Sequence, residues 1–122
     1  MPVYALVATS ALAQQLQRWL QGTPFELRLF QSVTELLAQA QQIDEQFLIL
    51  DYQYPELAAP QVIRLLRQQT TYPFTIILGE SGDVSMAVEA HKVQVSLYLE
   101  KPFSKGTLLQ HLYHWQDDAI TG

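Results

Sequence analysis

The feature that most constrains the fold is the stretch Phe47–Asp51 (FLILD), four large apolar residues followed at once by a carboxylate. A continuous apolar run of this kind is typical of a strand buried on both faces, as in a parallel sheet covered by helices. Residues 52–55 (YQYP) follow and are typical of a loop. In open parallel sheets the ligand crevice lies outside the carboxyl ends of the strands, so Asp51 stands where such a fold places reactive groups. Aspartate also commonly begins turns or caps helices, and on this stretch alone that structural role is favoured.

Strand-like and helix-like segments alternate along the chain. The expected strands are Val3–Thr9, Phe25–Phe30, Phe47–Asp51, Phe74–Leu78 and Ser96–Glu100. The helix signals that follow them are the capping residues Ser10, Ser32 and Ser104, the first-turn proline Pro60, and the apolar spacing within Val84–Lys92. The second strand alternates apolar and charged residues and is expected to be half-buried at a sheet edge. Five such βα units predict an α/β fold, a parallel sheet with helices on both faces.

The overall composition limits the possible functions. At 122 residues the chain can form one core, which we expect over residues 1–116, with 117–122 as a tail or the start of a linker. The absence of cysteine excludes a disulfide framework, a thiolate zinc site and a cysteine nucleophile. No apolar run is long enough to span a membrane and no leader is evident, which fits a cytoplasmic protein. The net charge of −5 and the dispersed Lys and Arg residues argue against nucleic-acid binding by this domain.

Two further segments carry a resemblance to a known family. They are residues 82–90 (GDVSMAVEA) and 97–103 (LYLEKPF). Together with Asp51 at the end of the third strand and Pro55 beyond it, they closely resemble receiver domains of bacterial two-component response regulators, most of all those that precede helix-turn-helix output domains. The resemblance covers essentially the whole chain. It implies a flavodoxin-like (βα)5 three-layer sandwich with the strand order 2-1-3-4-5.

The resemblance also implies a set of site residues. In the family, the aspartate matching Asp51 accepts a phosphoryl group from a histidine kinase. A lysine at the position of Lys101 pairs with the phosphoryl oxygens, a Ser or Thr after strand four hydrogen-bonds them, and an aromatic at the position of Tyr98 turns inward. Magnesium is held by the aspartate, an acidic pair after strand one, and a backbone carbonyl at the position of Gln53. The bond between this lysine and the following proline is commonly cis.

Part of this apparatus is missing from the chain. The acidic pair falls on Ala8 and Thr9, and the switch hydroxyl position falls on Gly79. Magnesium favours oxygen ligands that include one or two carboxylates, and only Asp51 remains. Without a hydroxyl at Gly79, the usual link between phosphorylation and Tyr98 is cut. We therefore expect no bound metal and no other cofactor, and the orientation of Tyr98 remains open.

The losses predict a degenerate receiver. Asp51 and Lys101 can approach each other directly, so we expect a standing ion pair that holds the domain in one conformation. Glu80 and Ser81, in the loop after strand four, and the hydroxyl of Thr9 offer partial substitutes for the missing groups. For Glu80, a solvated loop charge is the favoured interpretation.

Three classes of function are compatible with these features. The leading hypothesis is a signalling module, not an enzyme, that acts by contact with a histidine kinase or another signalling protein and is weakly or not at all phosphorylated. The alternative is a conventional magnesium-dependent phosphoacceptor that controls a DNA-binding output domain. A small-molecule binder that uses the crevice at Asp51 is disfavoured, because the chain has no glycine-rich phosphate loop.

We also expect an interaction surface, which favours a homodimer on resemblance alone. It comprises the helix Val84–Lys92, the strand Ser96–Glu100 and the last helix. The side chains expected there are His91, Lys92, Tyr98, Lys105, His111 and Tyr113. The apolar residues on which the prediction of the helix Val84–Lys92 rests are Met86, Ala87, Val88 and Ala90.

The histidines and tryptophans receive structural interpretations. His111 and His114 lie three apart on the last helix, a spacing that permits shared metal ligation. No carboxylate or cysteine accompanies them on the same face, so surface histidines are favoured, His91 included. Trp19 and Trp115 recur with leucines at helical spacing and are expected in the core or at its rim.

Overall fold

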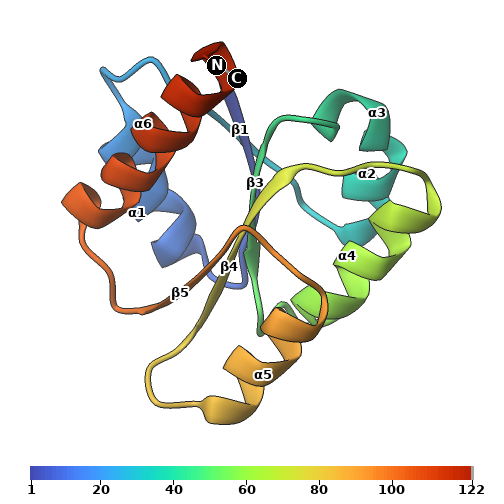
Figure 1. Ribbon diagram of the computed structural model, residues 1–122. Coiled ribbons are helices and arrows are strands. Elements are labelled where there is room, and N and C mark those ends of the chain that lie inside the picture. Colours follow the sequence, from blue (N-terminus) through green and yellow to red (C-terminus); the bar gives the residue numbers. More distant parts are fainter. Residues whose placement is uncertain (122) are drawn as a thin grey trace.

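The computed structural model describes the backbone of residues 1–121 and the side chains of residues 1–117. The strands are β1 (Pro2–Leu6), β2 (Glu26–Leu29), β3 (Phe47–Asp51), β4 (Phe74–Glu80) and β5 (Leu97–Lys101). The helices are α1 (Ser10–Leu20), α2 (Val33–Ala38), α3 (Ala40–Ile43), α4 (Ala59–Gln68), α5 (Val84–Lys92) and α6 (Lys105–Thr121). All strand pairs are parallel, in the order β2-β1-β3-β4-β5, which confirms the predicted flavodoxin-like sheet (Figure 1).

Helices cover both faces of the sheet. Figure 1 shows α1 and α6 on one face and α2 to α5 on the other. The central strand β3 is buried along its whole length and sends alternate side chains into the two layers. Leu48 and Leu50 pack in the layer beneath α2 to α5, and Phe47 and Ile49 pack beneath α1 and α6. The apolar run thus follows from double-sided burial, as predicted.

The helices begin at the predicted capping residues, except that the cap of α1 is Thr9 and not Ser10. The expected cap of α1 was Ser10, but the hydroxyl of Thr9 accepts the N–H of Leu12 at 3.2 Å and Ser10 is the first helical residue. At α2, Ser32 accepts the N–H of Glu35 at 3.0 Å, as the capping box predicts.

The carboxyl end of β4 differs from the prediction. The sequence predicts that the fourth strand ends at Leu78 and that residues 79–83 form a loop. Instead Gly79 and Glu80 continue β4, where Gly79 pairs with Glu100 and Glu80 pairs with Lys101 of β5. The expected fifth strand, Ser96–Glu100, is accordingly shifted by one residue, and backbone pairing with β5 outweighs the local turn signal.

Two helical segments also differ from the expectations. The polar stretch after α2 forms a separate short helix, α3, because the N–H of Gln39 bonds to the carbonyl of Leu36, three residues back, and interrupts the α-helical pattern. The expected tail is helical as far as Thr121 in α6, and Gly122 lies outside the described residues. In the part of the chain that the structure describes, no helix combines the length and apolar character needed to cross a membrane.

Candidate functional site at Asp51

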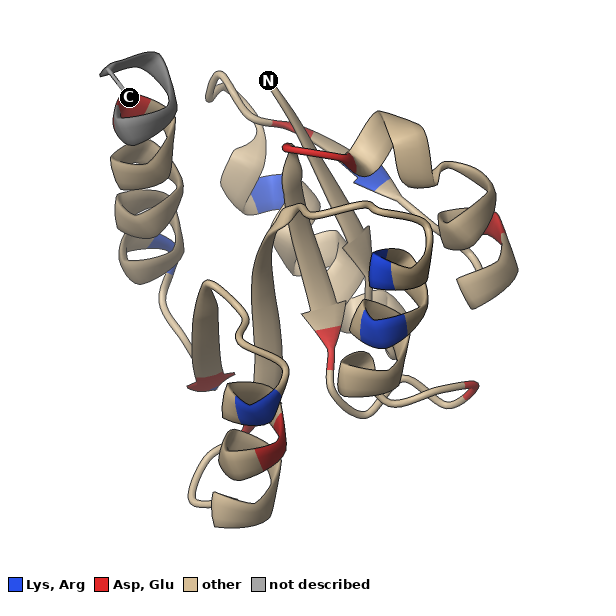
Figure 2. Cartoon of the chain, turned by 45° about the vertical axis from the view of Figure 1, so that its right-hand side comes forward, with Lys and Arg blue, Asp and Glu red and all other residues tan. Residues whose placement is uncertain are grey.

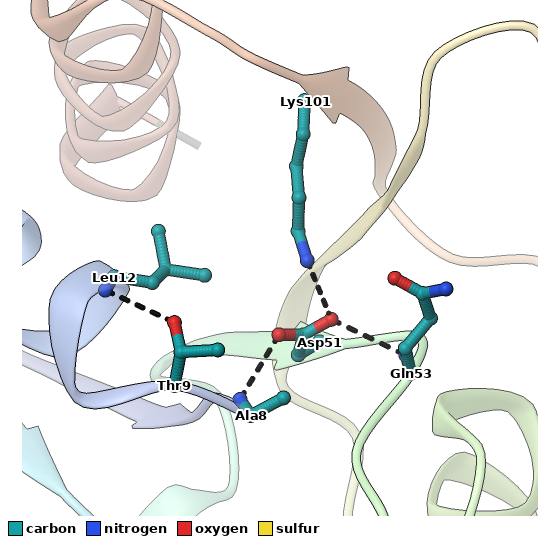
Figure 3. Close-up of polar contacts among 6 residues, drawn as sticks. All are labelled: Ala8, Thr9, Leu12, Asp51, Gln53 and Lys101. Carbon is teal, nitrogen blue, oxygen red and sulfur yellow. Dashed lines mark hydrogen bonds and ion pairs between the residues drawn. The ribbon is translucent and has the colours of Figure 1, made fainter.

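The site lies at the carboxyl edge of the sheet, where β1, β3 and β5 bring residues from three parts of the chain together. Asp51 is only 1% exposed. Its Oδ2 accepts the backbone N–H of Ala8 at 2.9 Å, and its Oδ1 accepts the N–H of Gln53 at 3.2 Å (Figure 3). Lys101 donates from Nζ to the same Oδ1 at 2.9 Å. The expected ion pair between Asp51 and Lys101 is therefore present.

The carboxylate of Asp51 is buried and has hydrogen-bond donors on both of its oxygens. The side chain of Asp51 is 0% exposed and that of Lys101 is 23% exposed, so the pair is largely removed from water. A buried carboxylate without a partner is strongly destabilising, and here both oxygens receive donors. The bond between Lys101 and Pro102 is cis.

The two positions of the missing acids have other roles. Ala8 donates its backbone N–H to Asp51, and its methyl side chain offers no oxygen atom to a metal ion. The hydroxyl of Thr9 is used for the cap of α1 and accepts the N–H of Leu12 (Figure 3). Among residues 1–117, no group of three or more histidine, aspartate or glutamate side chains is placed to hold a metal ion.

Tyr98 is turned inward, which answers the question that the sequence left open. Its hydroxyl oxygen is buried, and no described residue forms a hydrogen bond with it. The ring packs against the apolar layer beneath α2 to α5. It lies over Gly79, where a Cβ atom would overlap both the hydroxyl and the ring.

The surroundings of Tyr98 favour its neutral form. Burial is the main cause that raises the pKa of Tyr98, followed by the carboxylates of Glu100 and Asp83, the neighbouring phenol of Tyr52, and Glu80. The phenol is therefore protonated at neutral pH and remains a hydrogen-bond donor. Glu80 itself is exposed, consistent with a solvated charge, although it ends a strand and not a loop.

The remaining candidates take structural positions. His91 and His114 are exposed, as expected. His111 differs from the expected surface histidine, because it is half-buried with its ring centroid 6.1 Å from that of Trp115. Trp19 and Trp115 are both half-buried at the rim of the core, as expected.

The expected interaction surface has a different composition from the prediction. Tyr98 is turned away from it, whereas Val84 is 73% exposed and Val88 is 44% exposed on α5. Val88 is thus exposed although it is one of the apolar residues on which the prediction of this helix rests. The two valines are four residues apart and so share one face of the helix, a spacing that was visible in the sequence. Lys and Arg residues are spread over several elements of the chain (Figure 2).

Comparison with known proteins places this geometry in a family. The sequence profile described as "Response regulator receiver domain" matches residues 9–113. The transcriptional regulatory protein FixJ of Rhizobium meliloti is 29% identical over 86 residues, covering 70% of this chain and 42% of FixJ. FixJ of Bradyrhizobium diazoefficiens is 28% identical over 107 residues, covering 87% of this chain and 52% of that protein. The chain thus spans about half the length of the curated relatives it matches.

Solved structures agree at the level of the fold. The crystal structure of FixJ-N superposes with a TM-score of 0.83 at 25% identity, covering 92% of this chain and 90% of that one. The receiver domain of Francisella response regulator 1452 superposes with a TM-score of 0.83 at 19% identity, covering 97% and 98% of the two chains. With the profile match, the strand order and the Asp51–Lys101 pair in place, the chain belongs to the response regulator receiver domain family.

Proposed function

We propose that this receiver domain acts in two-component phosphorelay signalling mainly through protein contacts, as a pseudo-receiver in which phosphorylation of Asp51 is weak or absent. The observation that carries the proposal is the donor set around Asp51. Lys101 and the N–H groups of Ala8 and Gln53 occupy its two oxygens. The site offers hydrogen-bond donors where magnesium needs oxygen ligands.

The residues of the site do not fit a magnesium ion. A hard divalent cation is held by oxygen atoms, and Asp51 supplies the only carboxylate among the contacts described above. Thr9 has a hydroxyl, but this group already accepts a hydrogen bond from α1. Transfer of a phosphoryl group to a carboxylate requires its charge to be neutralised, and Lys101 alone supplies one positive charge. This imbalance supports weak or absent phosphorylation.

The proposal also covers the partners of the domain. The family relation supports a histidine kinase or another signalling protein as the partner. The FixJ relatives are named transcriptional regulatory proteins, which supports a role in transcription regulation, with DNA contacted by a region outside this domain. The exposed apolar side chains of Val84 and Val88 support a homodimer through α5, β5 and α6.

The test is a titration with magnesium followed by the phosphoryl mimic beryllofluoride, observed by amide chemical shifts. We expect the resonances of Asp51, Gly79 and Tyr98 to stay in place at millimolar concentrations of both. Saturable shifts that are abolished by Asp51→Asn contradict the proposal, because they require a working site at that carboxylate.

A gain-of-function variant tests the physical cause. Ala8→Asp combined with Thr9→Asp restores two carboxylates beside Asp51, and aspartate at position 9 remains a good helix cap. We expect this double variant to show saturable magnesium shifts that the natural chain lacks. The matched control is Ala8→Asn with Thr9→Asn, which has nearly the same shape without the charges. Equal magnesium responses in the two double variants contradict the explanation.

A further inference from the structure

Gly79 and Tyr98 are neighbours across the sheet although they lie far apart in the sequence. Tyr98 pairs in register with Ile77 of β4, and Gly79 follows two residues later on the same face. The phenol ring leans from β5 toward the carboxyl end of β4 and fills the volume that a side chain at position 79 would occupy. In a family member with Ser or Thr there, that volume belongs to the switch hydroxyl.

The ring of Tyr98 and a side chain at position 79 would occupy the same space. A Cβ atom at position 79 would overlap the hydroxyl and two ring carbon atoms of Tyr98. Such an overlap requires one group to move, and the backbone of β4 is held by pairing with β3 as far as Leu78 and with β5 through Gly79 and Glu80. With the Tyr98 ring in its present position, no side chain fits at position 79, so a residue larger than glycine there requires the ring to shift.

The buried hydroxyl gives a second, independent observation. It is the one buried side-chain polar atom without a hydrogen-bond partner among the residues described. Leaving such a group unpaired opposes the inward position, so the packing of the ring into the space above Gly79 must outweigh it. An outward ring would lose its packing against Gly79 and the apolar layer.

We propose that Gly79 and Tyr98 form a fixed packing pair that holds the aromatic inward in the resting protein, so that the surface between α5 and β5 exists in one form whatever the state of Asp51. Glycine at position 79 lacks the hydroxyl of the switch, and it also leaves the space that the Tyr98 ring fills. The inference is independent of whether Asp51 can be phosphorylated.

The experiment measures the solvent exposure of the Tyr98 ring in the free protein. Tyrosine rings are isotope-labelled, Tyr98 is assigned with Tyr98→Phe, and a soluble gadolinium chelate broadens the exposed rings. Tyr72, whose exposed fraction is 59%, is the internal reference for an exposed ring. We expect Tyr98 to be much less broadened than Tyr72, and Gly79→Ala to raise its broadening to a similar level. Equal broadening of Tyr98 and Tyr72 in the natural protein overturns the inference, as does a protected Tyr98 in Gly79→Ala.

A double-mutant cycle keeps the test valid if Gly79→Ala folds poorly. In the natural background, Gly79→Ala should lower the denaturation midpoint clearly. In a Tyr98→Ala background the same change should have no effect or raise the midpoint, because alanine is better than glycine in a strand. Equal losses in the two backgrounds show that the positions are uncoupled and overturn the inference.

The two proposals can fail separately. Beryllofluoride shifts at Asp51 with an unchanged, protected Tyr98 ring contradict the proposed function and leave the packing pair intact. An exposed Tyr98 ring in a protein whose resonances do not shift with beryllofluoride contradicts the packing pair and leaves the proposed function intact.

Discussion

At the scale of single residues, the site depends on one buried carboxylate and the donors that surround it. Asp51 is fully buried and receives three hydrogen bonds, and only the one from Lys101 carries a charge. Because charge-assisted hydrogen bonds are roughly twice as strong as neutral ones, Lys101 contributes most to the balance of this site.

Replacing Lys101 should therefore destabilise the domain. We expect Lys101→Met to lower the free energy of unfolding by about 3 kcal/mol, because it leaves a buried charge uncompensated. Urea denaturation followed by circular dichroism measures the change. Lys105→Met removes an exposed lysine and should change stability by less than about 0.5 kcal/mol. Equal effects of the two substitutions would contradict the role assigned to the ion pair.

Tyr98→Phe should act in the opposite direction. The phenylalanine ring keeps the packing over Gly79 and removes the hydroxyl that has no hydrogen-bond partner in the described structure. We expect a gain of about 1 kcal/mol in the free energy of unfolding, the lower end of the penalty for an unpaired buried polar group. A loss of stability in the same urea experiment would mean that the hydroxyl has a stabilising contact.

The same phenol predicts a loss of stability in alkali. Burial is the first cause that raises the pKa of Tyr52, Tyr54 and Tyr98 above the ordinary value of 10.0. The folded state then holds protons that the unfolded state releases, so stability is complete below pH 10 and falls as the pH rises beyond it. We expect the free energy of unfolding to decline above pH 10, with a smaller slope in Tyr98→Phe. An unchanged slope in that variant contradicts the prediction.

At the scale of elements, α3, α4 and α5 end without the glycine that commonly follows a helix. The backbones at Glu45, Thr70 and Gln94, just after α3, α4 and α5, have φ values of 62°, 57° and 55°, a region that favours glycine. At the end of α4, Thr70 donates to Arg67 and Thr71 donates to Leu66, the hydrogen-bond pattern that glycine commonly closes. These helices end where the fold requires the chain to turn toward the next strand.

Thr70→Gly should stabilise this turn. Glycine adopts a positive φ without the clash of a β-branched side chain, so we expect a gain of about 1 kcal/mol in the free energy of unfolding. The matched control is Gln68→Gly in the last turn of α4, which should cost about 1 kcal/mol because it weakens the helix. Thermal unfolding of both variants measures the difference. Losses at both positions would contradict the strain argument.

At the scale of the whole molecule, the proposed dimer interface is centred on α5, where two valine side chains are exposed. Val84 and Val88 lie on one helix face beside β5, and both are exposed. An apolar face of this kind is typical of an interaction site when it adjoins polar residues such as Glu89 and Lys92, which form an ion pair at 3.0 Å.

Val84→Lys should accordingly weaken self-association. We expect sedimentation equilibrium to show a dimer whose dissociation constant rises about tenfold or more in the variant, the effect of losing roughly one buried valine. Tyr72→Lys is the control, because this exposed aromatic precedes β4 and so lies at the amino end of the sheet, opposite the end where Val84 begins α5. A monomeric natural domain contradicts the dimer proposal, and equal weakening by both variants contradicts its location.

The sequence by itself determined the features that local patterns encode. Periodicity and capping located β3 and α5 with their observed bounds, and the end of the apolar run located Asp51 at the functional edge. The resemblance carried by the segment that contains Lys101 supplied the strand order. These features depend on burial and backbone chemistry within a few neighbouring residues.

Only the tertiary structure decided how distant residues combine. It turned Tyr98 inward over Gly79, extended β4 through a glycine, and placed the N–H of Ala8 on Asp51. It also left Val88 exposed, although the apolar spacing that predicts α5 includes this residue. Each of these outcomes depends on a contact between elements that the chain brings together only after the sheet has formed, and local periodicity holds no information on such contacts.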